Sequence, residues 1–394
     1  MRSATRRQGL RPRCTGLVCC VLAACATGLA GETESAGKDL GPDEKALAAL
    51  IEEAVPSPWS TAASLRAATG YRDNVQLSSV NPVAAAFLSG GGDFMLNRLP
   101  LDGTGVSIFA SADYTHFLGA PQTDPESLAL ARAEVKRDLG AGWTGGLAGQ
   151  YVFMNQVFDV SATEAELSTV TAKGSTLTLT PSAAVSLGRN WKLEATLDGS
   201  RQLFSAPLDD YWELGPNVKL AKTLAAGSDC SLGYRFTRRW YDDRAPLDAD
   251  GLELPGNLEF DLHELEFRSK FAWGAQRRWS SQLRLGLRWT EDNGGGYFDN
   301  LRPLVGVRAG YRAERWKVWA EVRGYGYDYS IQRSDGPESA FRRKTDLDVT
   351  VRGEYRLWRK LVAFAQYDRE SAFDNAPSAD YDANTVTAGV ELEL

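Results

Sequence analysis

From about residue 60 to the end of the chain, apolar and polar residues alternate with a period of two. In the stretch QLRLGLRW at 282–289, every second residue is leucine or tryptophan, and the residues between them are polar, charged or glycine. A period of two is that of a β-strand, whose successive side chains point to opposite faces of a sheet. The sequence therefore predicts an all-β fold in which each strand has one apolar and one polar face.

The connections between these segments alternate between short and long. They are tight at 140–142 and 189–190, for example, but long and polar at 159–174 and 243–257. An even number of strands, with short turns at one rim and long loops at the other, is typical of a transmembrane antiparallel up-and-down β-barrel. We expect about 16 strands, at 60–72, 84–97, 104–117, 127–138, 143–157, 175–188, 191–204, 211–224, 229–242, 258–273, 279–291, 298–312, 316–330, 344–357, 361–371 and 381–394.

Several tryptophans lie next to the short turns. Amphipathic aromatic rings are enriched at membrane–water interfaces, where one part of the ring is apolar and the other is hydrated. A soluble β-sandwich would also alternate, but its loops would not divide into two lengths at two rims. We therefore expect a membrane girdle formed by Trp143, Trp191, Trp273, Trp279, Trp316 and Trp358.

The N-terminal region has the pattern of an export signal. Residues 1–13 contain several arginines and no acidic residue, and residues 15–30 are uncharged and apolar. This apolar stretch is short for a membrane-spanning helix, which favours a signal peptide over 1–30. Cleavage after Ala30 is one interpretation. In the other, Leu22–Cys25 resembles a bacterial lipobox, which would leave Cys25 as a lipidated N-terminus.

Residues 31–59 separate this signal from the barrel. The stretch PDEKALAALIEEAV at 42–55 begins with proline, has acidic residues in its first turn and carries leucines at helical spacing. It predicts a short helix in a periplasmic segment.

The barrel region, 60–394, resembles the general class of bacterial outer-membrane β-barrel (porin-like) proteins. The last segment, YDANTVTAGVELEL at 381–394, resembles the terminal insertion strand of that class, although it ends in Leu394 where the class prefers an aromatic residue. The resemblance implies a location in the bacterial outer membrane. It also implies outer-membrane lipids, lipopolysaccharide and the barrel-assembly machinery as partners.

Charged residues are frequent on the polar face of the strands. If the apolar face meets lipid, these charges face inward, and they need water or partners because unpaired buried charge is costly. A barrel of sixteen strands is wide enough to hold water. Between residues 229 and 330 the inward bases outnumber the inward acids. The predicted lumen and selectivity residues are Arg235, Arg239, Arg268, Lys270, Arg284, Arg288, Arg308, Arg312 and Arg323.

Guanidinium groups suit carboxylate and phosphate. The sequence thus predicts an outer-membrane channel for passive passage of small, preferentially anionic solutes. Two alternatives stay open at this point. One is an export pore or partner-linked barrel for an acidic polymer. The other is a closed structural or surface-binding barrel whose interior charges pair with one another.

Other functions find little support in the composition. The formal net charge is -7, whereas a nucleic-acid-binding chain should have a basic surplus. The chain has only 2 histidines, and we expect no metal site and no cofactor. His116 and His263 fall near the rim of the long loops without a nucleophile motif, so we expect no enzyme. At His263 the alternation shifts by one residue, which predicts a β-bulge.

Overall fold

The computed structural model describes residues 57–120, 123–163, 169–334, 338–376 and 379–394. The chain divides into two units, 1–56 and 57–394. The expected signal peptide, the possible lipidation site at Cys25 and the helix expected at 42–55 lie outside the described residues and stay predictions. In the described part of the chain, no helix is long and apolar enough to cross a membrane.

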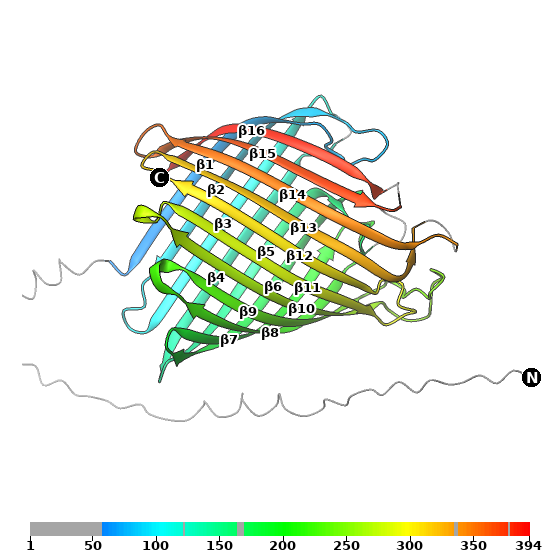
Figure 1. Ribbon diagram of the computed structural model, residues 1–394, viewed down its shortest axis with the longest axis horizontal. Coiled ribbons are helices and arrows are strands. Elements are labelled where there is room, and N and C mark those ends of the chain that lie inside the picture. The colour runs from blue at the N-terminus through cyan, green and yellow to red at the C-terminus, as the bar shows by residue number, and fades with distance from the viewer. Residues whose placement is uncertain (1–56, 121–122, 164–168, 335–337, 377–378) are drawn as a thin grey trace, which may run out of the picture. The chain divides into compact units, whose positions relative to one another are not determined.

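Residues 59–393 contain sixteen strands that close into one antiparallel barrel, with β1 pairing β16 (Figure 1). The prediction of the barrel and of its strand number is confirmed. The strands are β1 (Trp59–Arg72), β2 (Ala85–Arg98), β3 (Thr104–Leu118), β4 (Glu126–Gly140), β5 (Trp143–Asp159), β6 (Thr169–Gly188), β7 (Trp191–Phe204), β8 (Tyr211–Thr223), β9 (Asp229–Tyr241), β10 (Glu259–Trp273), β11 (Trp279–Asp292), β12 (Asn300–Arg312), β13 (Trp316–Arg333), β14 (Phe341–Arg356), β15 (Leu361–Asp374) and β16 (Tyr381–Glu393).

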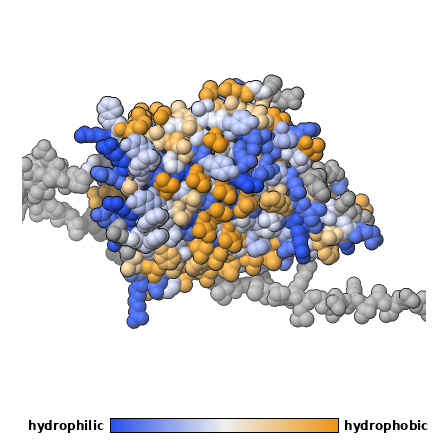
Figure 2. Space-filling view, turned by 45° about the horizontal axis from the view of Figure 1, so that its top comes forward, coloured by the Kyte–Doolittle hydropathy of each residue, from blue (hydrophilic) through white to orange (hydrophobic). Residues whose placement is uncertain are grey.

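The pairing register sorts the side chains between the two faces of the wall. Between β10 and β11, Leu265 lies opposite Leu287, and Glu264 lies opposite Arg288. The two leucines are 44% and 38% exposed and lie on the outer face, while the ion pair lies on the inner face. Hydrophobic residues accordingly cover much of the outer surface in Figure 2. An apolar exterior on a closed barrel is the architecture of an outer-membrane β-barrel.

The short turns have the backbone geometry that a tight hairpin requires. Arg189 and Asn190, between β6 and β7, both have positive φ, at 48° and 66°. Positive φ at both central residues is the type I′ geometry, whose twist matches that of the flanking strands. The tight end of the barrel is thus encoded by its turn residues.

The β5–β6 hairpin extends beyond its neighbours at the other end. β6 begins at Thr169, not near residue 175 as the sequence predicts, and Thr169 pairs with Asp159. β7 joins β6 only from Gly174 onward. The last residues of this hairpin therefore have no neighbouring strand beside them and are free to dock elsewhere.

The β-bulge expected at His263 is wrong. β10 pairs in unbroken register with both neighbours, and His263 lies opposite Phe236 and Trp289. The apolar residues change face for a different reason. Leu258, Phe260 and, at its edge, Leu262 belong to a hydrophobic cluster inside the loop end of the barrel, so the inner face is apolar there.

Candidate functional site

The inner face of β9–β13 carries a continuous set of basic side chains, which we call the arginine wall. The register places every predicted lumen residue on this face; Arg284, for example, lies opposite Arg268 on one side and Gly306 on the other. The arginine wall consists of Arg235, Arg239, Arg268, Lys270, Arg284, Arg288, Arg302, Arg308, Arg312, Lys317 and Arg323.

Carboxylates on this wall are shared between arginines. Glu266 pairs with both Arg268 and Arg284. Glu321 lies 3.7 Å from Arg308 and 3.1 Å from Arg323, measured between charged atoms. One carboxylate neutralises only one of two guanidinium groups, so the wall keeps positive charge that faces the lumen.

Arg302 and Lys317 belong to the wall but are not among the lumen residues predicted from the sequence. The guanidinium of Arg302 lies 4.4 Å from the ring centre of Tyr325 and 4.9 Å from that of Tyr327. Within the described ranges no ion pair of Arg302 is seen. The signal was present in the sequence, since Arg302 falls on the same face as Arg308 by simple alternation.

A pocket opens on the wall at this point. Gly286 lies between Glu266 and Leu304 in the register and carries no side chain to fill the space. The residues that line the pocket are Glu264, Arg284, Gly286, Leu287, Arg288, Arg302, Leu304 and Tyr325. Several guanidinium groups beside a vacant position form an environment suited to a carboxylate or another anion.

Acidic side chains gather on the neighbouring wall. Asp368 and Glu370 on β15, and Glu391 and Glu393 on β16, lie on the inner face. Arg352 lies 3.5 Å from Glu391 and neutralises part of this negative charge. The acidic side chains of β15 and β16 and the basic side chains of the arginine wall thus lie on different parts of the inner face.

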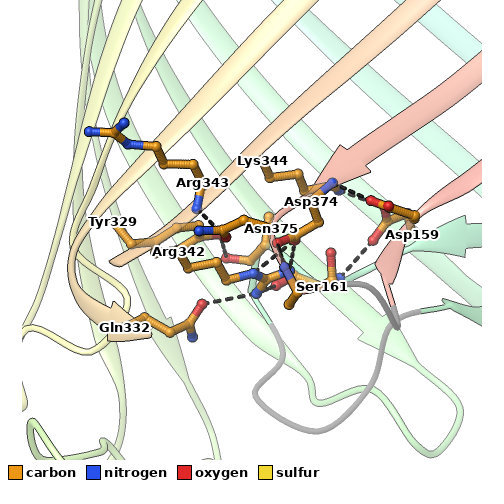
Figure 3. A network of polar contacts seen from close by, with 12 residues as sticks. Asp159, Ser161, Tyr329, Gln332, Arg342, Arg343, Lys344, Asp374 and Asn375 are labelled. Carbon is orange, nitrogen blue, oxygen red and sulfur yellow. Dashed lines mark hydrogen bonds and ion pairs between the residues drawn. The ribbon is translucent and has the colours of Figure 1, made fainter. Parts of the chain in front are cut away.

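Arg342 holds the β5–β6 hairpin against the far side of the barrel (Figure 3). It donates from Nη1 to the backbone oxygen of Ser161, at 2.7 Å, and from Nε and Nη2 to Asp374, at 2.9 and 2.6 Å. The Arg342 and Asp374 side chains are only 8% and 0% exposed. β6 and β14 lie eight places apart in the ring of strands, so the contact spans the mouth of the barrel.

A second buried ion pair makes the same connection. Lys344 Nζ lies 2.5 Å from Asp159 on the hairpin and 3.1 Å from Asp346 on its own strand. Tyr329 adds a hydrogen bond from its hydroxyl to the backbone oxygen of Ala162, at 3.2 Å. Residues 159–163 are thus fixed to β13–β15 by charged and neutral hydrogen bonds. We call this set of contacts the mouth network.

Other loops pack inward beside the mouth network. Leu77, from the β1–β2 loop, is 2% exposed and packs with Ala372, Tyr381 and Ala383. Phe298, from the β11–β12 loop, is 1% exposed in the cluster that includes Phe260. The loops are long and polar in the sequence, and their inward packing is not predicted by it. This packing narrows the loop end of the lumen.

The predicted girdle tryptophans lie beside the short turns. Trp273 and Trp279 flank the β10–β11 turn, and their rings stack with centres 5.3 Å apart. Trp358 is 76% exposed, while Trp191 is partly covered by Lys222, whose Nζ lies 4.9 Å from the ring centre. Their contact with a membrane interface stays a prediction.

The histidines lie on the outer face of the wall. His263 stacks on Trp289 with ring centres 4.7 Å apart, and its Nδ1 lies 2.8 Å from the hydroxyl of Tyr234. His116 pairs with Leu88 in the register. At the same rim, Asp242 accepts hydrogen bonds from Arg201, which hold the pKa of Asp242 below its usual range. We assign a packing role to His263, whereas His116 is exposed on the outer face.

Comparison with known proteins supplies fold similarity only. No family model and no curated protein matches the chain. Among solved structures, OprD from Pseudomonas aeruginosa has a TM-score of 0.45 at 11% identity, covering 85% of this chain and 93% of that one. OccAB1 from Acinetobacter baumannii has a TM-score of 0.47 at 9% identity, covering 85% and 97%. A bacterial polysaccharide outer membrane secretin has a TM-score of 0.43 at 10% identity, covering 84% and 98%.

Proposed function

We propose that this protein is a passive channel of the bacterial outer membrane that favours small anionic solutes. The observation that carries the proposal is the arginine wall, where Glu266 and Glu321 are each shared by two arginines. An excess of positive charge beside water raises the local anion concentration and repels cations. The mouth network limits solute size by narrowing the loop end.

The mouth network also favours a second candidate, a closed barrel that acts in structure or surface binding. If the barrel were completely closed, the shared carboxylates would serve only to balance the charge of the arginines on a hydrated inner wall. Ion current separates the two candidates, because a closed barrel conducts none. An export pore for an acidic polymer would use the same arginines, and residues 159–163 would have to leave their contacts with Arg342 and Lys344 to clear its path.

Removing charge from the arginine wall should weaken anion selectivity. The change is R284Q/R288Q/R308Q/R312Q, which keeps polarity and removes positive charge from β11 and β12. In planar bilayers with a salt gradient, the anion-over-cation permeability ratio should fall by on the order of twofold or more. The difference should fade in concentrated salt, because the screening length is about 8–10 Å at moderate ionic strength and shrinks above it.

The matched control removes the same formal charge from the rim of short turns. Arg189, Arg315, Arg359 and Lys360 are exposed there, and their change to glutamine should alter the ratio much less. The turn variant should keep its heat resistance, since exposed charges contribute little to stability. The wall variant should lose some heat resistance, because Glu264, only 21% exposed, loses its partner Arg288, while Glu266 keeps Arg268. An unchanged ratio in the wall variant, with conductance intact, would mean that ions take another path.

Orientation in the membrane gives a second prediction. An epitope tag inserted at 249–251, in the β9–β10 loop, should bind antibody on intact cells, because long loops of such barrels face outward. A tag at the turn 189–190 should bind only after permeabilisation. Labelling of the turn tag alone on intact cells would reverse the proposed topology.

A further inference from the structure

The pocket at Gly286 lies within the arginine wall and has the size of a small-ion site. Gly286 lies opposite Glu266 on β10 and Leu304 on β12, and the pocket above it has a volume of about 220 Å³. Pockets for drug-sized ligands are larger, at about 300–1,000 Å³. The space therefore suits a small anion with its remaining water.

Two of the guanidinium groups that line this pocket have acid partners. Arg284 donates from Nε to Glu266, and Arg288 donates from Nε and Nη2 to Glu264. Among the described residues, no acceptor meets Nη1 or Nη2 of Arg284, or Nη1 of Arg288. Each of the two arginines thus keeps donors for the oxygens of a ligand.

The third guanidinium, that of Arg302, has no acid partner in the described part of the chain. It lies opposite Arg288 in the register and beside the rings of Tyr325 and Tyr327. Its Nε is buried and meets no acceptor among the described residues. A buried donor without an acceptor is costly, and such groups mark places for an ion or water. Arg302 is therefore the group that a bound anion stabilises most.

The charges around the pocket do not balance. The charged inner-face side chains of β10–β12 in the three rows of the register centred on the pocket are Glu264, Glu266, Arg268, Arg284, Arg288 and Arg302. Four bases and two acids leave an excess of two positive charges. In the same rows, β9 adds Arg235, β13 adds Arg323, and neither strand adds an acid. Further away on β14, Asp346 pairs with Lys344. Asp348 lies opposite Arg323.

We infer that this pocket binds a tetrahedral oxyanion with two negative charges, the class of hydrogen phosphate, phosphate monoesters and sulfate. The inference rests on the proposed function and narrows its substrate class. Two negative charges neutralise the local excess, whereas a chloride ion or a single carboxylate neutralises half of it. The oxygens of a tetrahedral anion accept hydrogen bonds from several directions, and guanidinium groups match the geometry of phosphate.

Equilibrium binding tests the site without requiring ion current. The protein, refolded in detergent, is titrated in a calorimeter in dilute HEPES buffer with potassium sulfate, and with potassium nitrate as the singly charged control. Sulfate should saturate one site per chain and bind about tenfold more tightly than nitrate, comparable to one further charge-assisted hydrogen bond. Sulfate binding that is no tighter than nitrate binding overturns the inference.

Inorganic phosphate and glycerol phosphate are titrated in the same way. Both carry the tetrahedral dianion, and the pocket is open to the lumen, so binding of either supports the site. The ratio of their affinities tells whether the ligand is the free ion or a phosphate carried by a larger solute. Failure of both to bind overturns the inference.

The variant R302Q removes the guanidinium that has no acid partner. Sulfate affinity should fall about tenfold, because one charge-assisted interaction is lost. R315Q is the control, since Arg315 is exposed in the turn between β12 and β13 and does not line the pocket. It removes the same charge and should change sulfate affinity by no more than about twofold, as expected for a screened surface charge. Equal affinities in R302Q and the wild type overturn the inference.

Filling the pocket without changing charge is an independent test. A Cβ at Gly286 would lie 3.4 Å from Leu304 Cβ, an ordinary contact, so G286V should fold and should place its methyl groups where the anion lies. Its sulfate affinity should fall by about tenfold or more. G353V is the control, because a Cβ at Gly353 meets nothing within 4 Å and this strand position is outside the pocket. Wild-type affinity in folded G286V overturns the inference.

The outcomes for the site and for the channel are separable. Anion-selective current without sulfate binding contradicts the site and leaves the channel in place. Sulfate binding that R302Q weakens, in a barrel without current, contradicts the channel and leaves the site in place. Heat-modifiable migration on gels reports whether each variant folds, and R302Q decides the inference if G286V does not fold.

Discussion

Replacing Arg342 by methionine should raise the conductance of the barrel and make its current noisier. The change leaves the carboxylate of Asp374 buried without its partner, which costs about 3–5 kcal/mol in comparable sites. The hydrogen bond to the backbone of Ser161 is lost at the same time. Both effects weaken the docked state of residues 159–163, so the hairpin should leave the mouth for a larger fraction of the time. Single-channel recording measures this directly.

The adjacent residue supplies the matched control. Arg343 pairs with Asp328 outside the lumen, where the two side chains are 78% and 60% exposed. R343M should change conductance little, since such exposed pairs contribute about 0–1 kcal/mol. The double variant R342M/D374L removes both buried charges and should restore part of the docking. Wild-type conductance in R342M would show that the mouth network does not limit the current.

The barrel could be predicted from the sequence because each strand repeats the same local rule. Alternation places Leu265 outward and Glu264 inward without reference to any distant part of the chain. The arginine wall follows from the same rule. Arg302 follows from it too, once the alternation is continued along β12 from Arg308 to residue 302. These features depend only on neighbouring residues in the sequence, and on the outer face meeting lipid while the inner face meets water.

The mouth network could not be predicted in this way. Arg342 and Ser161 are 181 residues apart, and nothing in the alternation links them. One indirect signal existed, namely apolar residues on the inner face at the loop ends of strands. Phe260 and Leu262 are of this kind, and they produce the apparent shift of pattern at His263 that resembles a bulge. An inner face that turns apolar near the loops indicates packing by those loops.

Replacing Gly389 by alanine should impair closure of the barrel. Gly389 lies on β16 at the seam with β1, opposite Ala68. A Cβ there would lie 2.5 Å from the backbone oxygen of Ala67, 2.6 Å from Ala68 Cβ and 2.7 Å from Phe364. The backbone oxygen cannot move without breaking the β1–β16 ladder, and overpacking of this kind costs about 1–3 kcal/mol. The heat-modifiable band on gels should therefore convert at lower temperature, and less protein should reach the folded state.

Gly353 is the control for this change, because it lies in the strand β14 and a Cβ there meets nothing within 4 Å. G353A should fold like the wild type. Shortening Phe364 to leucine in the G389A chain removes one of the close contacts but leaves the backbone oxygen of Ala67 in place. That second change should thus restore only part of the heat resistance. Full restoration would locate the conflict in the Phe364 ring and not at the seam, and a G389A protein as heat-resistant as G353A would show that β1 and β16 can separate enough to admit a methyl group.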